Sequence, residues 1–227
     1  SKICFSTILG AIILPSALLV LVFSLTSQRL RTRVVAAWCI TTSGFTLMTL
    51  QILLLLAFQS VFGYVYRELA LLIGMMMAGI AAGSLLGLRH IRRRHETHLR
   101  YAAVNQSFIA IAAPLLLAIV YLLAETSNGA ASLWIVQAVF PLIALLCGLP
   151  GGYQYSLATA IYLKDRSRAS SLSTLYAVDL LGGCVGALLI AGFLIPVFGF
   201  WSVAWLAAAV SAAPAILAAR AGFYPAD

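Results

Sequence analysis

Seven apolar stretches of this chain are each long enough to cross a lipid bilayer as a helix. A hydrocarbon core of about 30 Å requires roughly 20 apolar helical residues. The stretches span residues 5–26, 36–58, 69–88, 101–123, 132–162, 170–194 and 200–219. Because little chain is left between them, the sequence predicts an all-α, polytopic membrane helix bundle that forms a single transmembrane domain over residues 1–227.

Basic residues occupy alternate gaps between the stretches. Of the 14 Lys and Arg residues, only Lys2 and Arg67 lie in the other gaps. The remainder follow the first, third, fifth or last stretch: Arg29, Arg31, Arg33, Arg89, Arg92, Arg93, Arg94, Arg100, Lys164, Arg166, Arg168 and Arg220. Short loops rich in Lys and Arg stay in the cytoplasm. The pattern therefore predicts seven crossings of the membrane, with the N-terminus outside and the C-terminus inside.

Composition argues against a soluble domain and against a nucleic-acid partner. The chain is 63% hydrophobic and 9% charged, with a mean hydropathy of +1.05. Its longest polar gap, residues 89–100, is too short to fold alone. The net charge of +8 is explained by the orienting charges, and no aromatic residues are interleaved with the basic run. The partners we expect are membrane lipids together with protein subunits or further copies of this chain.

The sequence contains no pattern typical of a catalytic or cofactor site. The cysteines Cys4, Cys39, Cys147 and Cys184 fall in four different stretches without C-x-x-C spacing, and we interpret them as packing residues. All three histidines lie within residues 90–98, in a cytoplasmic loop, which excludes intramembrane bis-histidine haem ligation by this chain alone. We predict no cofactor and no catalytic residue.

Glycines recur at four-residue spacing in several stretches. Gly79, Gly83 and Gly87 share one face of the third stretch, and Gly182 and Gly186 share a face of the sixth. Small residues at this spacing let two membrane helices approach closely. The pattern favours helix packing, and a substrate path along these faces is the alternative.

The fifth stretch is unusually long and contains two prolines. Pro141 and Pro150 each remove a backbone donor, and a glycine pair at residues 151–152 follows the second proline. We expect a kink or a short unwound segment near residues 148–152. Such breaks often line transporter sites, and a kinked span that merely fits its neighbours is the alternative.

Asp179 is the one acidic residue deep within a predicted span. A carboxylate there must be protonated, paired or turned toward a wet cavity, which makes it a functional-site candidate. Tyr176 lies one turn away, and matching of depth places Tyr153, Gln154 and Tyr155 at nearly the same level. We predict that Asp179 faces protein within hydrogen-bond reach of these three residues, either as a structural acid or as a proton- or cation-handling group.

Three runs of sequence resemble one known family. They are TSGFTLMTLQILLLLAFQSVFGYVYRELALLIGMMMAGIAAGS at residues 42–84, VFPLIALLCGLPGGYQYSLA at 139–158 and LYAVDLLGGCVGALLIAGFLIPVFG at 175–199. They resemble the membrane part of bacterial spermidine-synthase-like proteins, in which a major-facilitator-type module is fused to a polyamine aminopropyltransferase domain. The resemblance implies a bundle related to half of such a transporter plus one helix.

The chain departs from this family in two ways. Gln51 stands where relatives tend to carry an acid, so a proton-coupled role of that helix is not implied. The glycine-rich nucleotide loop and the acidic residues of an aminopropyltransferase are absent, so that activity does not carry over.

Two functions therefore remain at the level of sequence. The first is a non-catalytic membrane module that anchors or scaffolds a larger inner-membrane assembly, whose soluble part belongs to another chain or to a missing part of this one. The alternative is a carrier of small solutes or polyamines that works as an oligomer. For an intramembrane enzyme, the sequence offers no residue set.

Overall fold

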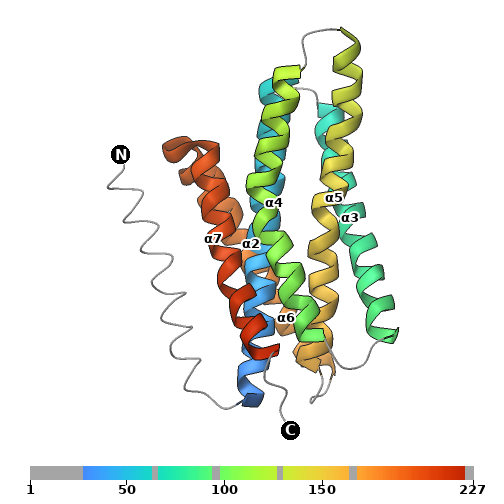
Figure 1. Ribbon diagram of the computed structural model, residues 1–227, viewed down its shortest axis with the longest axis vertical. Helices are drawn as coiled ribbons and strands as arrows, with labels where there is room; N and C mark the ends of the chain where they lie inside the picture. Colours follow the sequence, from blue (N-terminus) through green and yellow to red (C-terminus); the bar gives the residue numbers. More distant parts are fainter. Residues whose placement is uncertain (1–27, 63–65, 94–97, 127–129, 164–167, 223–227) are drawn as a thin grey trace.

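The computed structural model describes residues 28–62, 66–93, 98–126, 130–163 and 168–222, and in these residues the fold is entirely helical (Figure 1). The elements are α2 (Gln28–Phe62), α3 (Tyr66–Arg93), α4 (His98–Thr126), α5 (Ala130–Tyr162), α6 (Arg168–Leu189), the π-helical segment η2 (Ile190–Leu194) and α7 (Ile195–Gly222). No strand occurs in the described part of the chain.

Five helical segments in the described residues are long and apolar enough to cross a membrane, which indicates a multi-pass membrane protein. The predicted spans 36–58, 69–88, 101–123 and 132–162 fall within α2, α3, α4 and α5. The fifth segment, Leu172–Ala219, covers the predicted span 200–219 and all but the first two residues of the predicted span 170–194. The first predicted span, 5–26, lies outside the described residues. The total of seven crossings stays a prediction.

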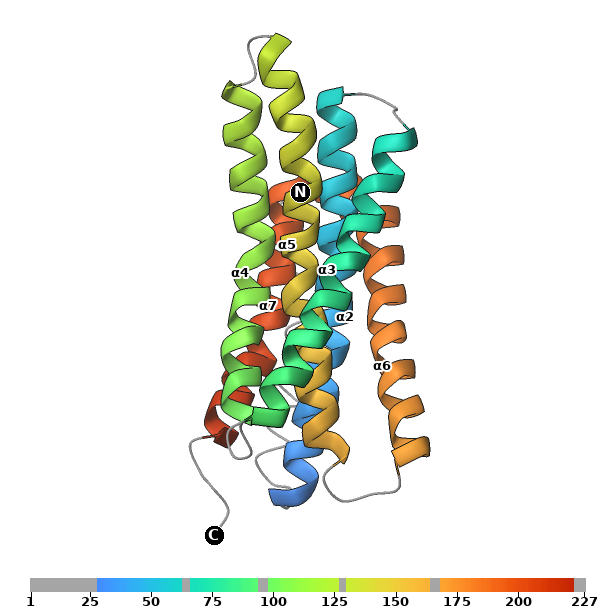
Figure 2. The same ribbon diagram turned by 90° about the vertical axis from the view of Figure 1, so that its right-hand side faces the viewer.

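The fifth segment changes direction at Gly199, where the backbone leaves the helical region with φ 76° and ψ 173°. Figure 2 shows that α6 and α7 run in opposite directions on either side of this point. The π-helical segment η2 precedes Pro196, which has no backbone N–H to offer the carbonyl group four residues earlier. Just before this proline, the Ile195 N–H bonds to the oxygen of Ile190, five residues earlier, which is the wider π register.

The central helix of the bundle is α2, which packs against α4, α5, α6 and α7 (Figures 1 and 2). On one side of the bundle α3 lies against α5, and on another α4 lies against α7. The main apolar core forms around α2 and includes an edge-to-face contact between Phe58 of α2 and Phe140 of α5, whose ring centroids are 5.3 Å apart.

Two of the helix contacts depend on glycine. A Cβ atom added to Gly79 or Gly83 of α3 would overlap the backbone oxygen of Leu145 or Leu149 in α5. A Cβ atom on Gly87 would stand 2.7 Å from the Ser156 Cβ atom. These three glycines, which the sequence assigned to packing, therefore lie where the α3 and α5 backbones meet.

The contact between α2 and α6 is built in the same way. A Cβ atom on Gly182 would overlap the backbone oxygen of Thr41, and one on Gly186 would stand 2.8 Å from the backbone oxygen of Phe45. At Gly79, Gly83, Gly182 and Gly186 the nearest opposing atoms belong to the backbone, which side-chain rotation cannot move aside. The helices therefore pack at a separation that only glycine permits.

Helix α5 has no unwound segment near residues 148–152, and a kink there stays a prediction. Helix α5 is continuous from Ala130 to Tyr162 and passes through both of its prolines. Donors from neighbouring helices reach the backbone there: Asn105 Nδ2 donates to the Pro150 oxygen at 2.8 Å, and Ser84 Oγ donates to the Gly152 oxygen at 3.2 Å. Proline removes the donor for the carbonyl group four residues earlier, so these bonds do not replace it; they tie the α5 backbone beside Pro150 to α4 and α3.

The described basic residues gather at one end of the bundle because of the directions in which the helices run. Figure 2 shows α3 ending at the same end at which α2, α4 and α6 begin. This end holds Arg89, Arg92 and Arg93 of α3, and Arg100 of α4. At the opposite end, Arg67 forms an ion pair with Glu68 at 2.9 Å in the first turn of α3.

Candidate functional site

A stripe of buried hydroxyl groups runs along α2, toward α4 and α7. Thr42 and Thr46 are one turn apart, and each bonds to a different helix. Gln106 Nε2 of α4 donates to Thr42 Oγ1 at 3.0 Å, and the Thr46 hydroxyl shares a hydrogen bond with Ser211 of α7. Thr42 also donates to the backbone oxygen of Trp38 at 2.9 Å. The stripe therefore links three helices through side-chain hydrogen bonds.

Two amide side chains extend this contact to α5. Asn105 Nδ2 of α4 donates to Gln154 Oε1 at 2.8 Å, in addition to its bond with the Pro150 oxygen. Gln154 is fully buried and also interacts with the Cys39 thiol of α2. We call the six residues that join α2, α4, α5 and α7 the polar layer: Thr42, Thr46, Asn105, Gln106, Gln154 and Ser211.

The polar layer consists of neutral groups only. Hydroxyls and amides donate and accept hydrogen bonds, but they do not ionise near neutral pH. Each interhelical bond of this kind contributes on the order of 0.6 kcal/mol in a membrane. The arrangement is therefore suited to fixing the helices against each other. Within the described residues there is also no group of three or more His, Cys, Asp or Glu side chains that could hold a metal ion.

Asp179 lies on the opposite side of α2, where α6 packs. Its backbone oxygen and its Oδ1 atom are each 2.6 Å from the position that a Cβ atom on Gly44 would take. Glycine at position 44 thus lets both the α6 backbone and the carboxylate approach α2. The side chain is partly exposed, and no hydrogen bond joins it to another described residue.

Asp179 was predicted to face the span that forms α5, but α6 packs mainly against α2 and has few contacts with α5. The three predicted partners diverge. Tyr155 interacts electrostatically with Asp179, whereas Gln154 bonds to Asn105 of α4. The Tyr153 ring lies against His90 of α3, with ring centroids 5.9 Å apart. Consecutive helical residues project about 100° apart, so a shared depth does not give a shared face.

The two remaining candidate residues do not contact the polar layer. Tyr176 of α6, one turn before Asp179, is 56% exposed and interacts electrostatically with Tyr155. Gln51 of α2 is partly buried and lies two turns beyond Gly44. The structure therefore brings Asp179 and Tyr176 together with Tyr155, and it leaves Gln51 at a different level.

Sequence reasoning missed the hydroxyl stripe of α2. Serine and threonine in membrane helices commonly bond to their own backbone, as Thr49 does to the Phe45 oxygen at 2.8 Å, so their presence alone predicts little. The available signal was spacing, because residues 42, 46 and 49 recur at intervals of four and three and so share one helix face. Ser211 of α7 had no such pattern around it.

The fold and this site define a multi-pass helical membrane protein with a hydrogen-bonded polar layer. Comparison of the chain with protein-family models, curated proteins and solved structures found no match.

Proposed function

We propose that this chain is a non-catalytic membrane module that anchors or scaffolds a larger assembly in the bacterial inner membrane. The observation that carries the proposal is that the side chains of the polar layer bond across helices and carry no charge, although the buried Gln106 Oε1 and Gln154 Nε2 atoms have no hydrogen-bond partner among the described residues, while the outer helices offer apolar faces. Only 22% of the spanning segment of α3 is buried within the bundle. A module of this kind offers partners an apolar surface within the membrane and a basic surface at its end.

The proposed module crosses the membrane seven times, with its N-terminus outside and its C-terminus in the cytoplasm. The gathering of Arg89, Arg92, Arg93 and Arg100 at one end of the bundle supports this orientation, since arginine-rich ends stay in the cytoplasm.

The resemblance to spermidine-synthase-like membrane modules suggests the kind of partner. In that family the membrane part accompanies a soluble aminopropyltransferase domain, and the motifs of that domain are absent from this sequence. We therefore propose a soluble enzyme domain of this class, supplied separately, as the first partner to test. Its contact with the module would involve the basic end, which is the end facing the cytoplasm in the proposed orientation.

Gentle solubilisation followed by affinity purification of the chain tests the scaffold function. We expect a soluble subunit to co-purify at a fixed stoichiometry, and we expect charge reversal of Arg92 and Arg93 to release it. Reversal of Arg67, at the other end of α3, is the matched control. A chain that purifies alone or only with copies of itself would contradict the proposal.

A second candidate function is a carrier of small cations such as polyamines. The partly exposed carboxylate of Asp179 beside Tyr155 favours it, because an ionisable group within a membrane span is costly and commonly functional. Binding of radiolabelled spermidine to the purified chain, compared between the wild type and Asp179→Asn, tests this function. Glu68→Gln, which removes a carboxylate at the membrane boundary, is the control. Equal binding by the wild type and Asp179→Asn would exclude the site.

A further inference from the structure

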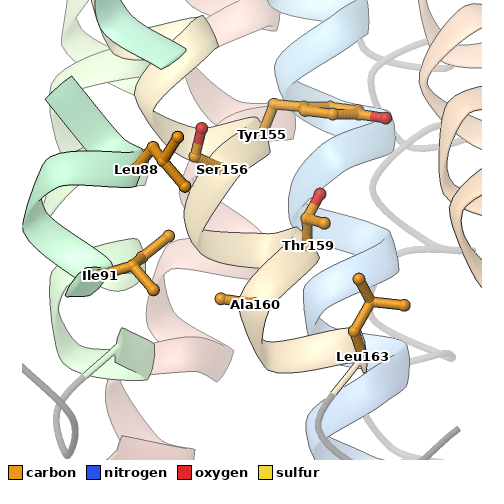
Figure 3. A pocket seen from close by; sticks show the side chains of 7 residues that line it. All are labelled: Leu88, Ile91, Tyr155, Ser156, Thr159, Ala160 and Leu163. Atoms are coloured by element: carbon orange, nitrogen blue, oxygen red, sulfur yellow. The ribbon is translucent and has the colours of Figure 1, made fainter. Parts of the chain in front are cut away.

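A groove of about 490 Å³ lies between α3 and α5 at the end of the bundle where the basic residues gather (Figure 3). Leu88 and Ile91 of α3 form one wall, and α5 contributes side chains from residues 155–163. Figure 3 shows Leu88 and Ile91 across from Ser156 and Ala160. Leu88 is 44% exposed, so the groove opens to the outside of the bundle. Its size lies within the range of about 300–1,000 Å³ that is typical of ligand sites.

The lining is apolar except for a few hydroxyl groups, of which one is unused. Ser156 Oγ already donates to the Ser84 oxygen at 3.0 Å. Thr159 Oγ1, in contrast, is buried and has no hydrogen-bond partner in the described part of the chain. A helical threonine normally bonds to the carbonyl group one turn earlier, so an unbonded buried hydroxyl leaves a donor for an added ligand.

Positive charge stands at the end of the groove. Arg92 follows Leu88 by one helical turn and so begins on the same face of α3. Arg89, Arg92 and Arg93 are all exposed in the last turns of this helix. A long arginine side chain at a helix end can extend along the apolar surface to the level of the lipid headgroups. The groove therefore combines an apolar wall with a hydroxyl donor, and the cationic end of α3 follows Leu88 and Ile91.

We propose that this groove binds one phospholipid with an anionic headgroup. An acyl chain would lie between Leu88, Ile91 and Ala160, the Thr159 hydroxyl would donate to an ester carbonyl oxygen, and Arg92 would pair with the phosphate. The cationic end selects an anionic lipid over a zwitterionic one, because each basic residue near the surface attracts anionic lipids. The proposal uses the membrane location of the bundle and is independent of the scaffold and carrier functions.

Native mass spectrometry of the delipidated full chain tests the site with two probes, phosphatidylglycerol and phosphatidylethanolamine that carry the same acyl chains. We expect the wild type to bind phosphatidylglycerol more tightly. Arg92→Gln should weaken phosphatidylglycerol binding about five-fold and phosphatidylethanolamine binding less, because the ammonium group of phosphatidylethanolamine already offsets the charge of its phosphate. Thr159→Val, which keeps the side-chain shape, should weaken both lipids about two- to five-fold.

The same measurement has two matched controls. Arg67→Gln removes an exposed arginine from the other end of α3, and Leu181→Trp enlarges an exposed side chain on α6. Both should bind lipid as the wild type does, whereas Ala160→Trp, which fills the groove, should lose both lipids. Equal affinity of the wild type for the two lipids, or equal binding by Ala160→Trp and Leu181→Trp, would overturn the proposal.

A measurement on the wild type alone guards against a variant that fails to fold. Phosphatidylglycerol that carries a diazirine on its acyl chain should crosslink within residues 84–93 and 155–163. Labelling spread evenly over the exposed faces of α3 and α6 would mean that only the surrounding bilayer is sampled, and it would overturn the proposal as well.

Discussion

Asn105 is the residue on which the contact between α4 and α5 most depends. Its Nδ2 group donates to both the Pro150 oxygen and Gln154 Oε1, each at 2.8 Å. Asn105→Leu would leave the buried Gln154 amide without this donor. We expect the free energy of unfolding to fall by about 1–2 kcal/mol, measured by SDS titration in mixed micelles.

Ser107 provides the control on the same helix. It is exposed, and its Oγ donates to the Ala103 backbone oxygen within its own helix at 3.0 Å. Ser107→Ala should change the free energy of unfolding by less than about 0.5 kcal/mol. A similar loss in both variants would mean that the Asn105 side chain contributes nothing specific to the contact between α4 and α5.

At the scale of single residues, the sequence predicted how deep a residue lies in the membrane but not which neighbouring helix its side chain faces. Counting along the predicted spans identified Asp179 as an acid within the membrane region. It did not identify the helix that packs against the acid, because that depends on how α6 is rotated and on Gly44, whose missing side chain admits the carboxylate. Glycine at position 44 gives no signal of its own in a chain with 17 glycines.

The glycines of α3 allow a test at the scale of helix packing. A Cβ atom on Gly83 would overlap the Leu149 backbone oxygen, whereas one on Gly74 of the same helix would meet nothing within 4 Å. Gly83→Ala must push α3 away from α5, and we expect a loss of about 1–3 kcal/mol. Gly74→Ala should be neutral or stabilising by up to about 1 kcal/mol, because alanine favours helix. Thermal unfolding of the two variants in detergent tests this prediction. Equal melting temperatures would contradict the close packing of α3 against α5.

The turn at Gly199 allows a second test of this kind. Its φ of 76° with ψ 173° is a conformation that essentially only glycine adopts. Gly199→Ala should therefore cost about 1–3 kcal/mol even though no atom lies within 4 Å of the added Cβ. Gly192→Ala in η2 is the control, since it has equal space and no positive φ. The same unfolding measurement applies, and an unchanged stability of Gly199→Ala would argue that the turn relaxes into another conformation.

At the scale of whole helices, hydropathy located α2, α3, α4 and α5 well, because the length and apolar character of a span are properties of its own residues. Local irregularity was not located. The sequence indicated a kink or an unwound segment near Pro150, where the structure shows no unwinding, and it indicated no irregularity at η2. Whether a proline unwinds a membrane helix depends on how that helix packs against its neighbours, and here Asn105 and Ser84 of other helices bond to the α5 backbone beside Pro150.

At the scale of the whole molecule, the charged residues and the packing contacts lie in different places. The glycine contacts and the polar layer hold the helices together from within, so the outer faces of α3 and α6 are free to be apolar. Exposed residues such as Leu85 and Leu188 would be costly in water but are suited to lipid. The basic residues contribute little to the packing, since they gather at one end, and that end determines orientation.

The orientation can be tested with two exposed positions at opposite ends of α3. In a background without the four natural cysteines, Tyr66→Cys lies at the end that carries few basic residues, and Arg93→Cys lies at the basic end. We expect a membrane-impermeant maleimide to label Tyr66→Cys on intact cells and Arg93→Cys only after permeabilisation. Loss of one arginine leaves the remaining basic residues to orient the bundle, so Arg93→Cys should not invert it. Labelling of Arg93→Cys from outside would reverse the orientation of every described helix and would also move the phospholipid groove to the outer leaflet.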